Sequence, residues 1–127
     1  MPIIIDGWNL IRNHMSEIDD AYGDSLESAR LLVSFLNDFQ RTHKDPITLV
    51  FDSKREHLDI DYTNTLKLKI VPARNADKYI KKYIDDFPQR QRGSLRVVSS
   101  DNDIYFYAKA GYAVPVKSEQ FWDKLKS

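Results

Sequence analysis

Two short apolar runs in this chain lead directly into acidic segments, and this pattern restricts the possible folds more than any other feature. Ile3-Ile4-Ile5 leads into Asp6, and Val97-Val98 leads into Ser99-Ser100-Asp101. Short apolar runs bounded by polar residues are typical of buried strands. Because ligands of open parallel sheets bind at the carboxyl ends of the strands, we expect these acids to gather at a binding edge.

Strand-like and helix-like segments alternate along the whole chain. Strands are predicted at about residues 2–6, 47–52, 66–70, 95–99 and 113–116, and helices at about 24–42, 75–87, 101–109 and 119–125. Such alternation implies a mostly parallel sheet covered by helices on both faces. We therefore predict an α/β fold, a three-layer α/β/α sandwich with about five strands, formed by one domain over residues 1–127.

Local signals refine three of these segments and one of the loops between them. Asp24-Ser25-Leu26-Glu27 has the form of a capping box at the start of a helix, and Asn75 is a suitable cap for the next helix. Apolar residues alternate with lysines over 66–70, which predicts a half-exposed edge strand. Residues 53–65 are charged and without periodicity, which predicts an exposed loop.

Composition excludes several classes of function. The 127 residues are 42% hydrophobic and 30% charged, which is typical of a globular protein. Lys plus Arg equals Asp plus Glu at 19 each, so net charge gives no indication of a nucleic-acid partner. The absence of Cys excludes disulfides, zinc–thiolate sites and thiol nucleophiles, and it fits a reducing, cytoplasmic compartment. We expect no signal peptide, no transmembrane helix and no membrane partner.

Four aspartates are candidates for a metal-binding active site. Asp6 ends the first strand, while Asp101 and Asp103 follow the fourth strand and open a helix. Carboxylates gathered at one edge repel one another unless a cation lies between them, and Mg²⁺ is held by one or two carboxylates with water and phosphate oxygens. One of the two later acids could be purely a helix cap, and Asp77, taken alone, is better explained as a residue at a helix start.

Three residues are candidates for supporting roles. Asn9 could orient Asp6 or a bound water, or could serve only as a helix cap. Ser99 could hydrogen-bond a carboxylate or a phosphate, or could simply form a turn. Asp52 could contact the metal through water, or bond the start of the following loop.

Basic residues cluster in several places, and we predict that Lys54, Arg55, Arg74 and Lys78 bind substrate. Further basic groups are Lys81, Lys82, Arg90, Arg92 and Arg96. The Lys81-Lys82 pair is most simply a solvated helix face. Groups that flank the acidic edge would steer a phosphate backbone toward it. Candidates for base stacking are Trp8, Tyr62 and Tyr79, although packing within the protein is the default role of such residues.

The motifs together resemble a known family. They are Asp6-Gly7-Trp8-Asn9-Leu10-Ile11, Val50-Phe51-Asp52, Ala76-Asp77-Lys78-Tyr79-Ile80 and Val98-Ser99-Ser100-Asp101-Asn102-Asp103. In order and spacing, over nearly the whole chain, they look like the YacP-like NYN branch of the PIN-like nucleases. The resemblance implies a three-layer α/β/α fold and an acidic Mg²⁺ or Mn²⁺ site that hydrolyses RNA.

Site roles follow from this resemblance residue by residue. Asp6 matches the first-strand acid, Asp77 the acid on the middle helix, Asp101 the fourth-strand acid, and Asp103 a further acid of many PIN-like sites. The resemblance thus changes the interpretation of Asp77 from helix cap to metal ligand. Lys78 stands where relatives often carry another acid, which predicts a less negative site.

Three hypotheses follow. The leading one is a metal-dependent endoribonuclease that cleaves single-stranded RNA, including ribosome-associated mRNA, with metal-activated water. The alternative is an RNA- or ribosome-binding module without turnover. A lower-ranked third is a phosphatase or phosphotransfer domain of another α/β fold, in which Asp6 or Asp52 becomes phosphorylated. An aromatic-rich set near the C-terminus would support a homodimer if part of it is exposed: Tyr105, Phe106, Tyr107, Phe121 and Trp122.

Overall fold

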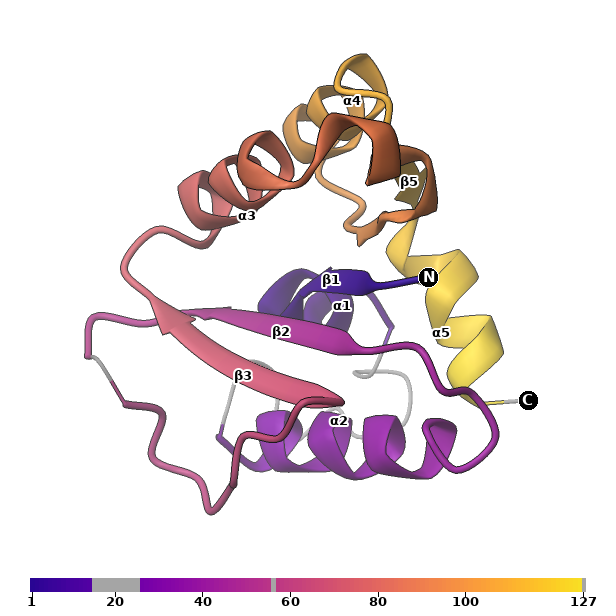
Figure 1. Ribbon diagram of the computed structural model, residues 1–127. Coiled ribbons are helices and arrows are strands. Elements are labelled where there is room, and N and C mark those ends of the chain that lie inside the picture. The colour runs from indigo at the N-terminus through magenta and orange to yellow at the C-terminus, as the bar shows by residue number, and fades with distance from the viewer. Residues whose placement is uncertain (15–25, 56, 127) are drawn as a thin grey trace.

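A five-stranded, all-parallel sheet forms the centre of the protein in a computed structural model, which describes residues 1–14, 26–55 and 57–126 (Figure 1). The strand order is β3-β2-β1-β4-β5. The strands are β1 (Ile3–Asp6), β2 (Ile47–Asp52), β3 (Leu68–Ala73), β4 (Arg96–Val98) and β5 (Val114–Val116). The predicted α/β fold class is confirmed.

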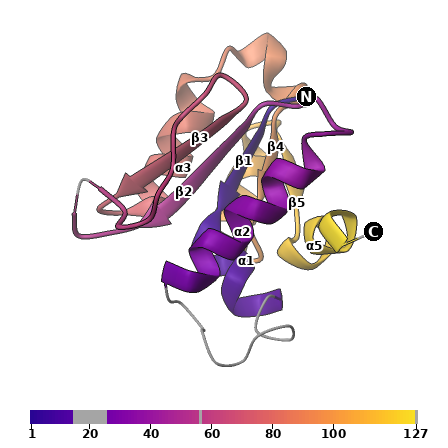
Figure 2. The ribbon, with the colours of Figure 1, turned by 90° about the horizontal axis from the view of Figure 1, so that it is seen from below.

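Helices cover both faces of this sheet (Figures 1 and 2). They are α1 (Gly7–His14), α2 (Leu26–Phe39), α3 (Ala76–Asp86), the 3₁₀ helix η2 (Gln89–Ser94), α4 (Asn102–Ala110) and α5 (Ser118–Lys126). Helices α1, α2 and α5 pack on one face, and α3 and α4 pack on the other. Among the described residues, no helix is both long and apolar enough to cross a membrane.

The order of the strands reverses direction at β1. The chain proceeds from β1 outward to β2 and β3, then returns through α3 to β4 on the other side of β1. Ile5 is in register with Leu49 on β2 and with Val98 on β4, so the residue after Val98 stands beside Asp6. In doubly wound sheets the crevice at such a reversal is where ligands bind. The fold therefore places the ends of β1 and β4 at its binding position.

Two local predictions are confirmed. The side chain of Asn75 accepts a hydrogen bond from the Lys78 backbone N–H and caps α3. Strand β3 lies at the edge of the sheet, with Leu68 and Ile70 buried and Lys69 exposed between them, but it begins at Leu68 and not at residue 66, and Leu66 is 90% exposed. Asp24 and Ser25 of the predicted capping box lie outside the described residues.

The prediction of an exposed loop over 53–65 is wrong in part. Leu58 and Ile60 are buried in the core beneath β2 and β3. Asn64 hydrogen-bonds both backbone groups of Ile70 and so covers the open edge of β3. Because two parallel strands need a crossover that also covers the sheet, and the described part of this one contains no helix, the loop itself supplies the apolar cover.

Helix α1 is a feature that the sequence analysis did not predict. The helix begins at Gly7, where a Cβ atom would lie 2.6 Å from the Phe51 ring and 2.9 Å from the Val50 carbonyl oxygen. Neighbouring Trp8 packs against Phe51 with 4.8 Å between ring centroids. Glycine is therefore required because the start of α1 lies directly on β2.

We expect Gly7→Ala to destabilise the protein by about 1–3 kcal/mol, since the new methyl group must displace a buried ring or backbone. Urea denaturation of the two proteins measures the difference. Gly93→Ala is the matched control, because no heavy atom lies within 4 Å of a Cβ at that position. Equal decreases in stability in the two variants would contradict this explanation.

Candidate active site

Asp6 occupies the central position of the candidate site. It is half-buried at the end of β1, where its carboxylate is hydrogen-bonded by the Asn9 backbone N–H and, at 3.4 Å, by the Ser99 hydroxyl. Burial raises the pKa of Asp6 from 3.8 to about 6, and the negative charge of Asp101 contributes to this increase. The charge of Arg12 acts in the opposite direction. Asp6 is therefore a carboxylate whose ionised form would be favoured by a nearby cation.

A network of uncharged polar groups fixes the loop that follows β4. Asn9 Oδ1 accepts hydrogen bonds from the Ser100 backbone N–H at 2.9 Å and from the Ser118 hydroxyl at 2.7 Å. The Ser100 hydroxyl accepts one from the Ser118 backbone N–H at 3.0 Å. Buried Ser99 donates to Asp6 and accepts from the Asp101 backbone N–H at 3.1 Å. Asn9 and Ser99 therefore hold the β4–α4 turn against β1.

Asp101 serves as the N-cap of α4. Its Oδ1 accepts hydrogen bonds from the backbone N–H groups of Asp103 at 2.8 Å and Ile104 at 3.3 Å. The side chain is exposed, and its charge still acts on Asp6. A carboxylate that caps with one oxygen keeps lone pairs on the other, so capping and metal binding do not exclude each other.

Asp77 and Asp103 face each other across a lysine. The Lys81 ammonium lies 2.6 Å from Asp103 Oδ2 and 3.5 Å from Asp77 Oδ1. Asp77 is in the first turn of α3, and Asp103 in the first turn of α4. The four predicted acids thus form two halves, Asp6 with Asp101 and Asp77 with Asp103. No three acidic or histidine side chains in the described ranges form a ready-made metal cluster.

Two predicted substrate-binding residues line hollows at the carboxyl ends of the strands, where the acids lie. Lys54 and Arg74, which follow β2 and β3, line one hollow of about 380 Å³. Lys54 also lines a neighbouring hollow of about 390 Å³ with Trp8, Arg12 and Asp52. Asp52 is exposed, and its carbonyl oxygen accepts a hydrogen bond from the Trp8 indole N–H at 2.9 Å. Trp8 therefore has a packing role, and Asp52 ends β2 two residues beyond Val50, which is in register with Asp6.

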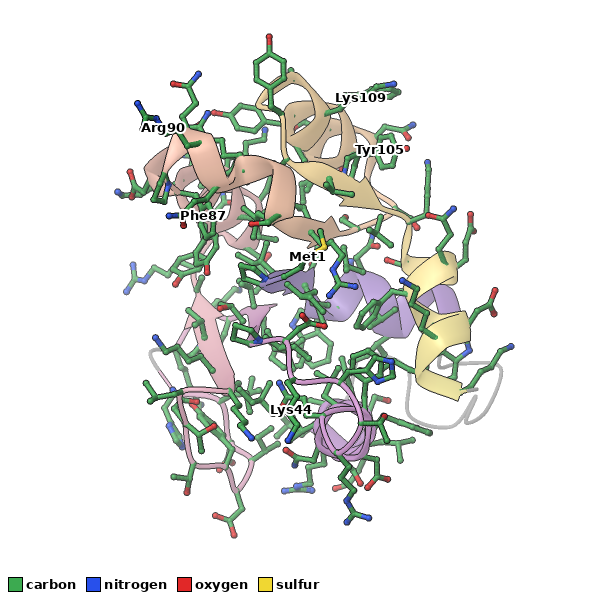
Figure 3. All side chains as sticks on the ribbon, turned by 45° about the vertical axis from the view of Figure 1, so that its right-hand side comes forward. Met1, Lys44, Phe87, Arg90, Tyr105 and Lys109 are labelled. Atoms are coloured by element: carbon green, nitrogen blue, oxygen red, sulfur yellow. The ribbon has the colours of Figure 1, made fainter. Side chains whose placement is uncertain are left out.

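Lys78 and Arg55 are at this edge as well, in the first turn of α3 and in the loop after β2. A further basic cluster, formed by Arg90, Arg92 and Arg96, does not flank the acids. Arg90 lies in η2 and, like Lys44, belongs to the opposite edge of the sheet, where strands begin (Figure 3). Arg96 there pairs with Asp45 at 2.9 Å. This cluster therefore has a structural setting remote from the site.

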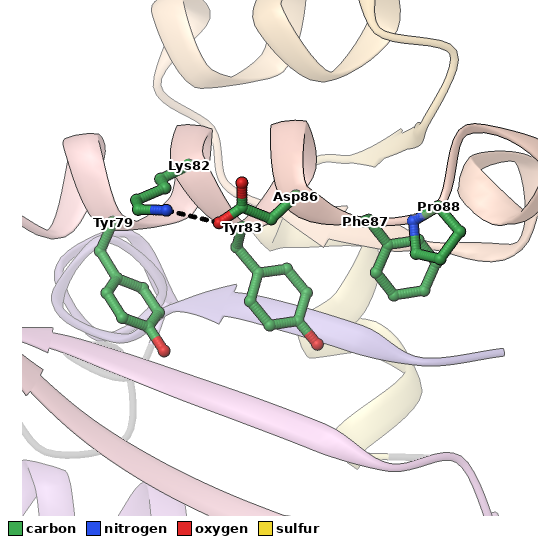
Figure 4. A pocket seen from close by; sticks show the side chains of 6 residues that line it. All are labelled: Tyr79, Lys82, Tyr83, Asp86, Phe87 and Pro88. Carbon is green, nitrogen blue, oxygen red and sulfur yellow. Dashed lines mark hydrogen bonds and ion pairs between the residues drawn. The ribbon is translucent and has the colours of Figure 1, made fainter.

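An aromatic groove runs along α3 away from Asp77. Tyr79, Tyr83 and Phe87 line a hollow of about 330 Å³, with a Lys82–Asp86 ion pair of 2.6 Å beside it (Figure 4). The rings lie on one side of the helix because they are spaced four residues apart. Tyr79, a predicted stacking residue, is therefore next to the acidic half-site but directed into a separate groove.

Sequence reasoning missed three residues of the site. Lys81 was interpreted as part of a solvated helix face, although its position four residues after Asp77 predicts an ion pair. Arg12 lies one helical turn after Asn9, but α1 itself was not predicted. Ser118 has no signal in the sequence, because only the pairing of β5 with β4 brings it to Asn9.

The fold and the site define a doubly wound α/β domain with acidic residues at its switch point. A family model described as the YacP-like NYN domain matches residues 3–127, and the chain belongs to this family. The resemblance to PIN-like nucleases is thereby confirmed, and the family supports a ribonuclease-like function. No curated protein sequence matches the chain.

Solved structures resemble the chain in fold. The crystal structure of Rae1 (YacP) from Bacillus subtilis superposes with a TM-score of 0.76 at 17% identity, over 99% of this chain and 74% of that chain. A Trp-to-Leu mutant of the same Bacillus protein gives a TM-score of 0.74 at 17% identity, over 99% and 76% of the two chains. At this identity the likeness shows the shared fold.

The raised pKa of Asp6 predicts a specific pH dependence of stability. The Asp6 carboxyl group loses its proton near pH 3.8 in the unfolded chain and near pH 6 in the folded protein. Its contribution to the free energy of unfolding is therefore greatest below pH 3.8 and is lost as the pH rises through about 6. The decrease is at most about 3 kcal/mol. We expect Asp6→Asn to be more stable than the wild type at pH 7.5, with the difference vanishing near pH 4.

Urea denaturation of both proteins at several pH values measures this difference. Asp59→Asn, at an exposed position, controls for the removal of one negative charge. A stability difference between wild type and Asp6→Asn that does not change with pH would show that Asp6 is not the responsible group.

Proposed function

We propose that the chain is a metal-dependent endoribonuclease that cleaves single-stranded RNA with metal-activated water. The observation that supports this most is the pair formed by Asp6 and Asp101 at the switch point. Two carboxylates from separate strand ends are held within electrostatic range of each other, and one has a raised pKa. A protein keeps such mutually repelling groups at a ligand-binding edge where a cation or a proton is needed.

The residues present fit a hard divalent cation such as Mg²⁺ or Mn²⁺. Asp77 Oδ1 is a buried oxygen that receives no hydrogen bond within the part of the chain that the structure describes, and the Lys81 ammonium lies 3.5 Å from it. Asp6 and Asp101 supply carboxylate oxygens, and one or two carboxylates with waters and phosphate oxygens are sufficient for Mg²⁺. When bound, such an ion lowers the pKa of a water ligand and offsets charge on the scissile phosphate.

The protein's own residues would bind and orient the substrate. Ser99 fixes the Asp6 carboxylate, and Asn9 fixes the turn that carries Asp101. Lys54, Arg74, Lys78 and Arg55 surround the same edge and would bind phosphates on either side of the cleaved bond. The reaction requires no covalent bond to the protein, because water is the nucleophile.

Substitution of the paired acids tests this function. We expect Asp6→Ala and Asp101→Asn each to lower Mn²⁺-dependent cleavage of labelled single-stranded RNA by about 100-fold or more, because each removes an oxygen from the metal site. Asp123→Ala, an exposed acid on α5, is the control and should cleave normally. Cleavage by Asp101→Asn at the wild-type rate would refute the assignment.

The alternative is an RNA- or ribosome-binding module without turnover. The Lys81 ammonium between two of the four acids favours this alternative, since it reduces the negative charge that attracts metal. The module would bind RNA in EDTA and after Asp6→Ala, and would release no products. Binding without cleavage in the wild type would favour it over the nuclease.

Both functions require a phosphate-binding surface, and Lys54 and Arg74 are its best-placed members. We expect the Lys54→Ala/Arg74→Ala double variant to bind single-stranded RNA more weakly. Its slope of log affinity against log salt should fall by about 0.7 for each phosphate that the variant no longer neutralises. Lys44→Ala, at the opposite edge of the sheet, should leave affinity and slope unchanged. If Lys44→Ala and the double variant had equal effects, RNA would not bind at Lys54 and Arg74.

A further inference from the structure

Lys81 is a positively charged group placed between two of the candidate metal ligands. Its ammonium contacts Asp103 Oδ2 at 2.6 Å and Asp77 Oδ1 at 3.5 Å, and only 25% of its side chain is exposed. The two carboxylates come from different helices, α3 and α4, and are more exposed than the lysine, at 44% and 67%. The lysine therefore lies beneath two solvent-facing acids.

An ion shared by Asp77 and Asp103 would have to occupy the position of the Lys81 ammonium. A divalent ion between the two carboxylates would have to displace the ammonium, because the two cations would otherwise be adjacent and repel each other. The other half of the site differs in this respect. There the neutral Ser99 hydroxyl, and not an ammonium, joins the two positions: it donates to the Asp6 carboxylate and accepts from the Asp101 backbone N–H.

We propose that the site holds one divalent ion, on the Asp6–Asp101 side, and that Lys81 supplies the second positive charge of the active site. This inference rests on the proposed nuclease function. Because Asp103 is exposed, the Lys81 ammonium can exchange this acid for a non-bridging oxygen of the scissile phosphate. A lysine binds phosphate as a point charge and requires no bidentate geometry.

A purely structural role for Lys81 is the competing explanation, since it also joins α3 to α4. The two helices have a second link, in which the Tyr107 hydroxyl donates to the Asp85 carboxylate at 2.7–2.8 Å. The Lys81 ammonium also lies 5.3 Å from the centre of the Tyr107 ring. Tyr107→Phe thus weakens the α3–α4 junction without changing the charge at Asp77 and Asp103.

The experiment counts Mn²⁺ ions bound by the RNA-free protein, using electron paramagnetic resonance, and measures RNA cleavage as a function of Mn²⁺ concentration. The test variant is Lys81→Gln. Lys82→Gln is the matched control, because it removes the same charge from the next position of α3, where Lys82 pairs with Asp86 instead of the candidate ligands. Lys81→Arg keeps the charge, and Tyr107→Phe tests the structural role.

We expect one bound ion in the wild type, Lys82→Gln, Lys81→Arg and Tyr107→Phe, and a second, weaker ion in Lys81→Gln. Cleavage by Lys81→Gln should fall about 100-fold at low Mn²⁺. It should recover at high Mn²⁺ with a second-order concentration dependence, whereas the wild type shows a first-order dependence.

Three results would overturn the proposal: two ions in the wild type, an unchanged ion count in Lys81→Gln, or equal defects in Lys81→Gln and Tyr107→Phe. Failure of the nuclease function itself is distinguishable. It would appear as no Asp6-dependent RNA cleavage by the wild type at any Mn²⁺ concentration, whatever the ion count.

Discussion

Repulsion between carboxylates at the switch point of the sheet is the constraint on which the site depends. Two halves of the site respond to it differently. Between Asp77 and Asp103 the protein inserts the Lys81 ammonium, whereas between Asp6 and Asp101 the repulsion persists and contributes to a raised pKa. An internal cation neutralises the carboxylates beside it when no ligand is present, while a pair of carboxylates without one keeps affinity for an external cation. Under the proposed function, this asymmetry would distinguish the position of the lysine from the position of a metal ion.

Packing and hydrogen bonds from uncharged groups, rather than ion pairs, hold Asp6 and Asp101 in place. The close approach of Gly7 to Phe51 fixes the start of α1 on β2, and Asn9 then reaches the turn after β4. Ser118 of α5 completes the network from the other side of that turn. Elements from both ends of the chain thus immobilise the β4–α4 turn, as expected for a site that must hold its geometry against electrostatic repulsion.

The sequence predicts the sheet and its acids well because both depend on local signals. Apolar runs define the strands, and parallel topology brings Asp6 and Asp101 to one edge. Helix α1 escapes prediction because the requirement for Gly7 comes from a distant strand. The bridging role of Lys81 depends on how α3 and α4 pack, which no local pattern in the sequence specifies. Roles set by tertiary packing are therefore the ones that sequence reasoning misses.

Burial of Asp6 links the site to the stability of the fold. Keeping this carboxylate ionised at neutral pH destabilises the folded state, because burial and Asp101 both favour the protonated form. A cation that binds only the folded protein would reverse this effect, by an amount that grows with the logarithm of its concentration. The same two carboxylates that weaken the fold without an ion would therefore strengthen it with one. Under the proposed function, the lower stability of the ionised form would be the physical consequence of holding Asp6 ready for a cation.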